Sequence, residues 1–409
     1  MRFDPNPLDV LVLPNDTLTV QPLPDYHQFP FACEGAKGVV YKVANGRRTQ
    51  KALKVFLEQF RSVSLVKSSM HLKNLSKLRG LRAARRQVLS PSDARVAGWP
   101  DLEYAVLMPW IKGRTWHDIL LEAQRGVPLD EGTSELLAKR FLDTVASMEA
   151  NGYAHCDLSA GNVVVGMSER GVSVQLVDLE DVFGLSTPNP NTCLLGTAGY
   201  QHRARHDVWR AEGDRYSAAV LAAEMLILSA PELARRASDR GYFCGSAEDP
   251  EAQRRWDAAL PWLRWRAPAF CALLERAWTS SRLEDCPSVR ELALAMSTIV
   301  RRADPPKLAT ASSARVPTTV FVPFDMKEII SAHQRAAPAE TRSSSAAPEG
   351  GRVGAPISRR IPDASALGAT APARSRRRSR ECWVRFAVAT TVAVIATVAI
   401  LGLITYFRN

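Results

Sequence analysis

Hydrophobic and polar positions divide most of the chain into a strand-rich part followed by a helix-rich part. Apolar runs flank Asn45-Gly46, a dipeptide typical of tight hairpin turns, and predict three strands within residues 31–56. Two more short strands are expected at residues 163–166 and 172–177. Apolar residues recur every three or four positions in residues 135–151, which is the periodicity of an amphipathic helix.

Further helices are expected before and after these elements. Residues 57–86 are predicted to be helical and very basic, with a solvated face of lysines and arginines from Lys67 to Arg86. A long apolar helix is expected to begin at Asp214, and more helices follow in residues 256–302. Residues 1–30, rich in Pro, Asp and Leu, are expected to pack as an extended leader without chemistry.

The chain changes character after residue 302. Residues 303–383 are rich in Ala, Pro, Ser and Arg and predict a flexible, disordered linker, because such a segment buries too little apolar surface to order itself. Residues 384–407 predict one transmembrane helix, since the 22 residues 386–407 carry no charge and span the roughly 30 Å hydrocarbon layer. Five arginines lie in residues 374–380, against Arg408 alone after the span, which predicts a cell-membrane protein with a cytoplasmic N-terminal part and its C-terminus outside.

Composition, charge and cysteine content narrow the class of protein. The 409 residues leave room for about two or three domains. The net charge of +11 is concentrated in residues 54–86 and in the C-terminal arginine cluster, which indicates anionic partners at those places and no nucleic acid. The seven cysteines are scattered without a C-x-x-C pair, a pattern typical of reduced thiols. The first residues lack the features of a signal peptide.

Three polar side chains lie beside the two short strands in residues 163–177. Asp157 and Asn162 precede the first strand, and Asp178 follows the second. A turn between the strands would bring all three to one edge, where their oxygens suit a hard cation such as Mg²⁺ carried with a phosphate. One of the three must face a hydroxyl group, and Asp157 is the candidate general base.

The run from His155 through Asp157 to Asn162, followed by Asp178, resembles the catalytic loop and metal-binding aspartate of the protein kinase superfamily. The resemblance implies an α+β, bilobal protein-kinase-like fold with a small antiparallel β-sheet N-lobe and a helical C-lobe. It places the kinase-like domain at residues 31–302, divided into N-lobe, hinge and C-lobe at 31–108, 109–112 and 113–302. It also implies that Asp157 is the catalytic base and that Asn162 and Asp178 are Mg²⁺ ligands.

A nucleotide site is indicated before the catalytic loop, in the order that the family has. The run from Cys33 to Val40 resembles G-x-G-x-x-G-x-V with cysteine at the first glycine, and Ala52-Leu53-Lys54 follows at the spacing of the V-A-I-K strand. Glycines let backbone N–H groups approach phosphate oxygens. By resemblance, Lys54 contacts the α- and β-phosphates and counts among the catalytic residues. The ATP-binding residues so implied are Gly35, Gly38, Val40, Ala52, Lys54, Met108 and Ile111.

Several positions depart from the family pattern. The helix glutamate that pairs with the strand lysine is absent, and Asp178 or Glu180 is the candidate replacement. Cys156 replaces the arginine that docks a phosphorylated activation segment, and Ser159 replaces a lysine that steadies the γ-phosphate. Glu180 stands at the glycine of Asp-Phe-Gly, and Leu179 can fill the apolar seat of the phenylalanine.

The end of the activation segment diverges as well. Residues 196–200 resemble the family's G-T-x-x-Y, but His202 begins the triplet that should read Ala-Pro-Glu. Cys286 replaces the arginine that pairs with that glutamate. Because both partners of one buried ion pair are missing, the loss need not destabilise the fold. Asp214 is expected to brace the backbone of the catalytic loop.

These patterns favour a membrane-tethered, bacterial-type protein kinase that transfers the γ-phosphate of ATP to Ser or Thr hydroxyls with Mg²⁺. A pseudokinase acting as a nucleotide-responsive scaffold is one alternative, favoured by the missing helix glutamate, Ser159 and Glu180. A small-molecule phosphotransferase is the other, because H-x-D-L without the lysine also occurs in antibiotic and choline kinases. The expected partners are a membrane, an unidentified protein substrate and, as a candidate, an acidic partner at the basic face of residues 67–86.

Overall fold

The computed structural model describes residues 3–47, 49–169, 171–184, 187, 197–202, 208–238, 240–244 and 250–299. The chain divides into two units, Met1–Thr318 and Thr319–Asn409, and all described residues lie in the first. The predicted linker and the predicted membrane span lie outside the described residues. Within those residues, no helix is both long enough and apolar enough to cross a bilayer.

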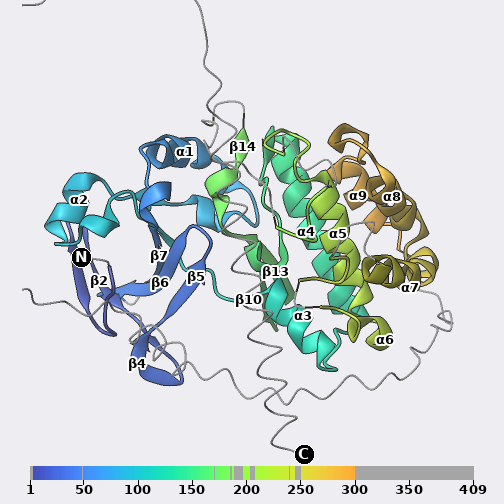
Figure 1. The fold of residues 1–409 in the computed structure, drawn as a ribbon, viewed down its shortest axis with the longest axis horizontal. Coiled ribbons are helices and arrows are strands. Elements are labelled where there is room, and N and C mark those ends of the chain that lie inside the picture. Colours follow the sequence, from blue (N-terminus) through green and yellow to red (C-terminus); the bar gives the residue numbers. More distant parts are fainter. Residues whose placement is uncertain are drawn as a thin grey trace, which may run out of the picture. The chain divides into compact units, whose positions relative to one another are not determined.

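A curled antiparallel sheet forms the N-terminal part of the first unit (Figure 1). Its seven strands run in the order β1-β2-β6-β7-β9-β8, with β5 beside β6. The bounds are β1 (Val10–Leu13), β2 (Asp16–Val20), β5 (Ala32–Gly35), β6 (Gly38–Asn45), β7 (Gln50–Phe56), β8 (Gln87–Val88) and β9 (Val106–Pro109). The three strands expected within residues 31–56 are β5, β6 and β7.

The N-terminal 30 residues contribute to this sheet. Strand β1 alternates exposed and buried side chains, so that Leu11 and Leu13 enter the core while Val10 and Val12 face outward. Strand β2 pairs with β6 and joins the leader to the sheet. Between them and β5, β3 (Pro22–Leu23) and β4 (Tyr26–Pro30) form a separate two-stranded sheet.

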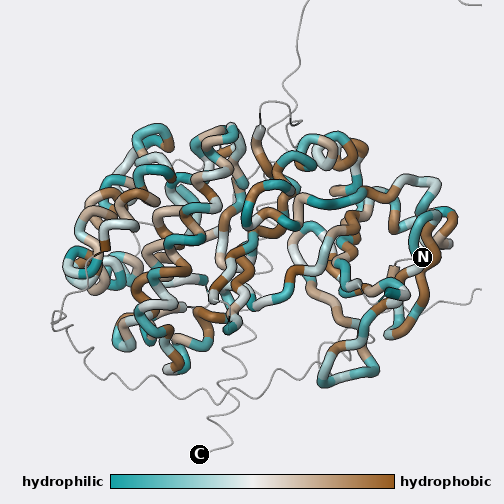
Figure 2. Tube along the Cα trace, turned by 180° about the vertical axis from the view of Figure 1, so that it is seen from behind, coloured by the Kyte–Doolittle hydropathy of each residue, from teal (hydrophilic) through white to brown (hydrophobic). Residues whose placement is uncertain are grey.

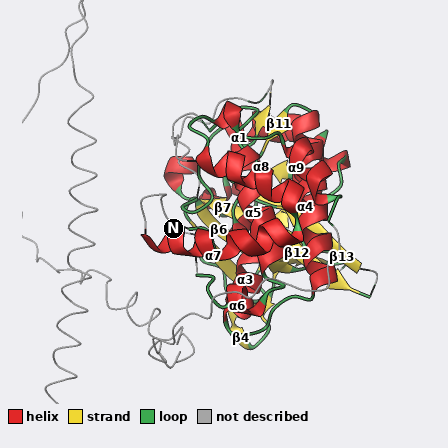
Figure 3. Cartoon of the chain, turned by 90° about the vertical axis from the view of Figure 1, so that its right-hand side faces the viewer, coloured by secondary structure: helices red, strands yellow, loops and turns green. Residues whose placement is uncertain are grey.

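Helices make up most of the second half of the unit (Figure 3). They are α3 (Trp116–Gln124), α4 (Glu131–Ala150), α5 (Arg215–Ile227), α6 (Pro231–Ala234), α7 (Pro250–Arg266), α8 (Pro268–Thr279) and α9 (Val289–Met296). Apolar and polar stretches alternate along this part of the chain (Figure 2), as expected when each helix buries one face. Helix α5 is the exception, because all its residues from Ser217 to Ile227 are buried.

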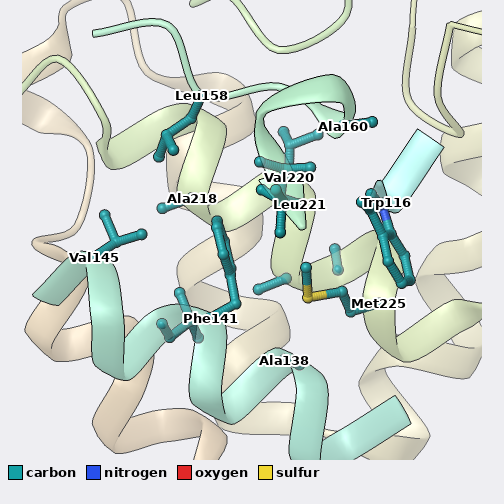
Figure 4. Close-up of a cluster of buried hydrophobic side chains, with 14 of the residues drawn as sticks. Trp116, Ala138, Phe141, Val145, Leu158, Ala160, Ala218, Val220, Leu221 and Met225 are labelled. Atoms are coloured by element: carbon teal, nitrogen blue, oxygen red, sulfur yellow. The ribbon is translucent and has the colours of Figure 1, made fainter. Parts of the chain in front are cut away.

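The helix predicted over residues 135–151 is α4. Asp130 caps its first turn by accepting a hydrogen bond from the Thr133 N–H, and Gly152 follows its end with φ 76°. Figure 4 shows the apolar cluster that α4 shares with α3, α5 and the loop at residues 158–160. Phe141 of α4 and Trp116 of α3 are fully buried in it.

The basic segment at residues 57–86 is not the continuous helix that the sequence predicts. Only α1 (Ser64–Leu72) is α-helical, and 3₁₀ turns at Glu58–Phe60, Leu75–Lys77 and Arg82–Ala84 make up much of the rest. The chain turns at Gly80, which has φ 85°. The buried leucines Leu72, Leu75 and Leu81 hold the segment against the core without the regular spacing of one helix. The prediction of a basic face is also wrong at Arg86, whose side chain is only 2% exposed.

Two small sheets lie beside the helices. Strands β10 (Arg114–Thr115), β12 (Val163–Ser168) and β13 (Gly171–Leu176) form one, and β11 (Tyr153–Ala154) pairs with β14 (Phe183–Gly184) in the other. β12 and β13 are the two short strands that the sequence predicts. The whole unit is therefore α+β, with an antiparallel sheet before a helical part, as expected for a kinase-like fold.

Candidate active site

The site begins with Lys54, which projects from strand β7 and is 4% exposed. Its ammonium group pairs with the carboxylate of Asp178 and lies 3.0 Å from Oε2 of Glu180. Burial alone would lower the lysine pKa, but the two carboxylates outweigh it and raise that pKa. Lys54 is therefore a buried permanent cation that joins the N-terminal sheet to the segment after β13.

Glu180 is held by a second cation. Arg86 donates from Nη1 to Glu180 Oε1 at 2.7 Å and from Nη2 to the Leu179 carbonyl at 2.6 Å. The side chains of Arg86 and Glu180 are 2% and 4% exposed, so this is a nearly dry ion pair. Helix α1 contains no acidic residue, and Glu180 takes the place of the missing helix glutamate beside Lys54.

The two carboxylates on Lys54 differ in their proton affinity. Burial alone would raise the pKa of Glu180, but Lys54, Asp178 and Arg86 together hold that pKa well below its ordinary value. The pKa of Asp178 lies above its ordinary value because of burial and the negative charge of Glu180, against the effect of Lys54. Asp178 keeps 35% of its side chain exposed. Glu180 is therefore the permanent anion, and Asp178 is the carboxylate that solvent or a cation can reach.

Val177 joins the segment of Asp178 to the catalytic loop. The Val177 N–H donates to the Asn162 carbonyl at 3.0 Å, and the Val177 carbonyl accepts from His155 Nε2 at 2.8 Å. A carbonyl can only accept, so the His155 proton lies on Nε2, and its buried Nδ1 has no partner in the described structure. The next residue, Asp178, adopts the left-handed conformation with φ 62°, which aspartate tolerates better than most residues.

Asp157 and Asn162 lie in the catalytic loop, on either side of one turn. The Asn162 side-chain NH₂ donates to the Asp157 carbonyl at 2.7 Å, and Thr197 donates its hydroxyl to Asp157 Oδ1 at 3.1 Å. Burial raises the pKa of Asp157, against a smaller opposing effect of the nearby His155. The Asn162 amide oxygen accepts no hydrogen bond within the described residues, so it remains available to another ligand.

Asp214 holds the backbone of this loop by hydrogen bonds, as the resemblance implies. Its carboxylate accepts hydrogen bonds from the backbone N–H groups of His155 at 2.5 Å and Cys156 at 2.8 Å. Cys156 has φ 62°, an uncommon conformation for a non-glycine residue. The two bonds to a carboxylate that is only 3% exposed hold that conformation. Asp214 thus precedes α5 without capping it and positions the backbone before Asp157.

The glycine-containing loop is a tight hairpin between β5 and β6. Gly35 pairs with Gly38, and a Cβ on Gly38 would lie 2.1 Å from the Val55 carbonyl oxygen, so only glycine fits there. The Lys37 carbonyl accepts from the Leu57 N–H at 2.9 Å. The Lys37 ammonium group pairs with the carboxylate of Asp181, three residues after Asp178.

The remaining expected nucleotide residues lie on the same strands. Val40 faces Lys54 across β6 and β7, and Ala52 faces Met108 across β7 and β9. Ala52 and Met108 are buried in one core, with Val40 packed against it. The Ile111 N–H makes no hydrogen bond within the part of the chain that the structure describes. The structure therefore brings all the expected sheet residues together around Lys54.

His202, near the end of the activation segment, contacts the segment around Ser280. His202 Nε2 lies 2.9 Å from the Ser280 hydroxyl, which lies 3.1 Å from the Cys286 sulfur. All three residues are buried. Within the described residues, hydrogen bonds therefore join His202, which begins the divergent triplet, to Cys286, which stands at the family's arginine.

Glu224 of α5 is a further buried acid, and sequence reasoning missed it. It is 0% exposed and accepts hydrogen bonds from Tyr242 N at 2.6 Å, Tyr200 Oη at 3.0 Å and Trp116 Nε1 at 3.2 Å. Burial raises its pKa to about 7, against the effect of these donors. Tyr200 closes the activation segment, so Glu224 ties that segment to the core of the helical part.

Arg86, Lys37 and Asp181 were also missed as parts of the site. The sequence predicts that Arg86 lies on a solvated face. The residue that it contacts, Glu180, lies 94 positions later in the chain. Lys37 carried a visible signal, because it is a lysine directly before the second glycine of the loop, Gly38. Asp181 did as well, since it is the third acid within four residues of the segment that starts at Asp178.

The donor set suits Mg²⁺ carried with a phosphate and not a metal held by protein alone. The described residues contain no group of three or more His, Cys, Asp or Glu side chains arranged to hold a metal ion. A site at the catalytic loop would use one carboxylate, from Asp178, and one amide oxygen, from Asn162. Mg²⁺ is commonly bound by one or two carboxylates together with phosphate oxygens and water, so these residues fit it.

Comparison with known proteins supports the same family. The chain is 37% identical over 92 residues to nucleosomal histone kinase 1 of Drosophila melanogaster, covering 20% of this chain and 15% of that protein. It is 32% identical over 146 residues to putative cyclin-dependent kinase F-2 of Oryza sativa subsp. japonica, covering 32% of this chain and 40% of that protein. The two matches support the protein kinase superfamily. No protein-family model matches the chain, and it spans less than half the length of either kinase.

Proposed function

We propose that the protein is a membrane-tethered protein kinase that transfers the γ-phosphate of ATP to Ser or Thr hydroxyls of proteins. The observation that carries the proposal is the contact between Lys54 of the N-terminal sheet and Asp178, beside a loop that holds Asp157 and Asn162. The similarity to two protein kinases supports a kinase-like function for the same chain. Serine/threonine specificity and membrane tethering are the finer parts of the proposal.

Each side chain has a role in this reaction. Asp157 accepts the proton of the substrate hydroxyl, whose oxygen forms a bond to the γ-phosphorus. The bond from that phosphorus to the β–γ bridging oxygen breaks, and its electron pair stays with ADP. Lys54 positions the α- and β-phosphates and neutralises part of their charge, while Glu180 and Arg86 hold Lys54 in place.

Asn162 and Asp178 would hold Mg²⁺, which neutralises charge on the phosphate oxygens when it is bound. Asp178 would then exchange part of its contact with Lys54 for the cation. The raised pKa of Asp178 would fall at the same time, because a cation favours the ionised carboxylate. Lys54 keeps Glu180 as a partner throughout, so it is not left unpaired during this exchange.

The test is Asp157→Asn in the full-length chain, purified in detergent, with γ-labelled ATP and Mg²⁺. Autophosphorylation and transfer to added proteins are expected to fall by about 10²–10⁴-fold, while ATP affinity stays within threefold. Asp143→Asn is the matched control, because Asp143 is exposed on α4 and its one ion pair among the described residues is with Lys139. Equal transfer by the wild type and Asp157→Asn would reject the role of Asp157.

Phosphoamino-acid analysis of the product tests Ser/Thr specificity, and label on tyrosine alone would reject that specificity.

A nucleotide-responsive pseudokinase is the second candidate. It is favoured by one observation, namely that the expected metal ligand Asp178 is itself bound to Lys54. If that contact persists, Mg-ATP raises the melting temperature without any turnover, and this result would select the pseudokinase.

A small-molecule phosphotransferase would instead phosphorylate a hydroxylated small molecule faster than any protein. The contact of Thr197 with Asp157 disfavours it, since a protein-kinase-like activation segment then reaches the base.

Membrane tethering rests on the uncharged residues 386–407 and the arginines before them. The full-length chain is expected in the membrane fraction after high-salt and carbonate washes, and a chain that ends at residue 383 is expected to be released. A tag at the C-terminus should be cleaved by protease added outside intact cells. Recovery of both chains in the soluble fraction would reject the tether. The acidic partner at residues 67–86 remains a proposal for the residues other than Arg86.

A further inference from the structure

The catalytic loop contains no cation for the phosphate that is transferred. Between Asp157 and Asn162 the chain reads Leu158-Ser159-Ala160-Gly161, and Ser159 is 5% exposed. In phosphoryl transfer, charge on the oxygens of the transferred group must be stabilised by fixed positive charge. If the proposed kinase function holds, a side-chain cation that assists Mg²⁺ at that place therefore comes from another part of this chain.

Three cations contact the acids that surround the site in the described structure. Lys54 contacts Asp178 and Glu180, Arg86 contacts Glu180, and Lys37 contacts Asp181. The Lys54 and Arg86 side chains are 6% and 2% exposed, and both are fixed by Glu180. The Lys37 side chain is 23% exposed and has one carboxylate partner. Lys37 is thus the cation that an incoming ligand can reach.

The backbone of the β5–β6 hairpin places Lys37 beside the acidic segment after β13. Lys37 lies at the tip of the β5–β6 hairpin, whose position is held by the Lys37–Leu57 backbone bond and by the close packing of Gly38 on Val55. From there its side chain reaches Asp181, 144 positions later in the chain. Its positive charge also acts on Asp157, where it lowers the pKa of the candidate base against the dominant effect of burial. The tip of the loop therefore faces the segment after Asp178, and the Lys37 charge lies near enough to act on Asp157.

A lysine ammonium group has three N–H donors, and Asp181 uses one of them. We propose that Lys37 donates the others to the γ-phosphate of ATP and thereby supplies the charge that the catalytic loop lacks. The contact with Asp181 keeps the ammonium group in place before and during transfer, since a side chain that is already held loses less freedom on binding. In the reaction, the hydroxyl oxygen bonds to the γ-phosphorus, its proton passes to Asp157, and the electron pair of the broken bond leaves with ADP. Lys37 stabilises the charge on the oxygens of the group in transfer and neither gains nor loses a proton.

The variant that tests this role is Lys37→Met in the full-length, detergent-purified chain. Lys51→Met is the matched control, because Lys51 lies on β7 and pairs with Asp16 at 2.5 Å, away from the catalytic loop. The first measurement is the ratio of ATP to ADP affinity with Mg²⁺, which isolates the γ-phosphate and needs no turnover. Wild type and Lys51→Met are expected to prefer ATP, and Lys37→Met to lose roughly 10- to 100-fold of that preference, as for a hydrogen bond to a charged group.

The second measurement is turnover. Lys37→Met should lower kcat/KM for ATP by at least the same factor. Loss of the γ-phosphate contact raises the KM for ATP, and any strengthening of that contact in the transition state adds a fall in kcat. Adding Ser159→Lys to Lys37→Met should restore at least tenfold of the loss, because it returns a cation from the other side. If that double variant does not fold, Lys37→Arg serves instead, and it should keep the preference for ATP.

The outcomes separate this inference from the proposed function. If Lys37→Met matches the wild type in both measurements, the role of Lys37 is rejected while the kinase function stands. The wild type could instead show no turnover and yet prefer ATP, with Lys37→Met losing that preference and Lys51→Met keeping it. The transfer function would then fail, and the γ-phosphate contact would be supported. If the wild type binds neither nucleotide, both proposals are rejected.

Discussion

Glu180→Gln is the substitution that tests how Lys54 is held. In the wild type, Glu180 lies 2.7 Å from Arg86 Nη1 and 3.0 Å from Lys54 Nζ, with all three side chains at most 6% exposed. Glutamine preserves the shape of the side chain and removes its charge. Lys54 would then keep the carboxylate of Asp178, whereas Arg86 would lose its ion pair and keep the Leu179 carbonyl.

The size of the effect follows from these distances and from burial. With an effective dielectric constant of about 20, each contact contributes roughly 5–6 kcal/mol of Coulomb attraction, and the desolvation of the ions offsets most of it. Removing one partner of a buried ion pair costs about 3–5 kcal/mol. Because the amide oxygen of glutamine can still accept one hydrogen bond, we expect the lower end, about 3 kcal/mol, or a fall in Tm of roughly 6–12 °C.

The assay is urea unfolding of the wild type, Glu180→Gln and a control, Glu122→Gln. Glu122 lies 2.5 Å from Arg114, but both side chains are more than 40% exposed, so its loss should cost less than about 1 kcal/mol. The depressed pKa of Glu180 sets the pH dependence. Its contribution is present above the ordinary glutamate pKa of 4.5 and is lost as the pH falls through the lower value in the folded state. If Glu180→Gln were as stable as Glu122→Gln at pH 7, Glu180 would not be the residue that holds Lys54.

Two further predictions concern a buried acid and the glycine loop. The pKa of Glu224 is raised from 4.5 to about 7, so the folded state holds a proton that the unfolded state releases, and stability should fall by about 3 kcal/mol as the pH rises from 4.5 to 7. Urea unfolding between pH 4.5 and 8 should show a steeper decline in the wild type than in Glu224→Gln, which keeps the contribution of other raised groups such as Asp178, and equal slopes would contradict the prediction. Gly38→Ala would place a Cβ 2.1 Å from the Val55 carbonyl oxygen and should weaken ATP affinity at least tenfold with a loss of about 1–3 kcal/mol in stability. Gly46→Ala, with no atom within 4 Å of its Cβ, is the control, and ATP titration of both variants is the measurement.

The N-terminal strands must be present in the protein used for all these experiments. Strand β2 pairs with β6, whose other neighbours carry the glycine loop and Lys54. Leu11, Leu18 and Val20 lie in the same core as Leu53, directly before Lys54. A chain that begins at residue 31 would expose this core and remove the β2 partner of β6, so the leader must be kept.

Local pattern was sufficient for much of the fold and for part of the site. The hairpin around Asn45-Gly46, the strands β12 and β13 and the helix α4 all follow from periodicity and turn residues, which act over a few neighbouring positions. Asp157, Asn162 and Asp178 could be chosen for the same reason. The register of two adjacent strands brings Asn162 and Val177 into hydrogen-bond contact, and Asp178 follows at once.

The sequence by itself singled out Asp157, Asn162, Asp178 and Lys54 as candidates for the proposed chemistry, because their spacing is short and their side-chain types are specific. Only the tertiary structure decided how the charges pair. Arg86 and Glu180 are 94 positions apart, and Lys37 and Asp181 are 144 apart, so no local pattern connects them. A buried cation takes the carboxylate that packing brings nearest, and packing depends on the whole chain. For this reason the partner of Lys54 and the reach of Lys37 became visible only when the sheet and the catalytic loop were seen together.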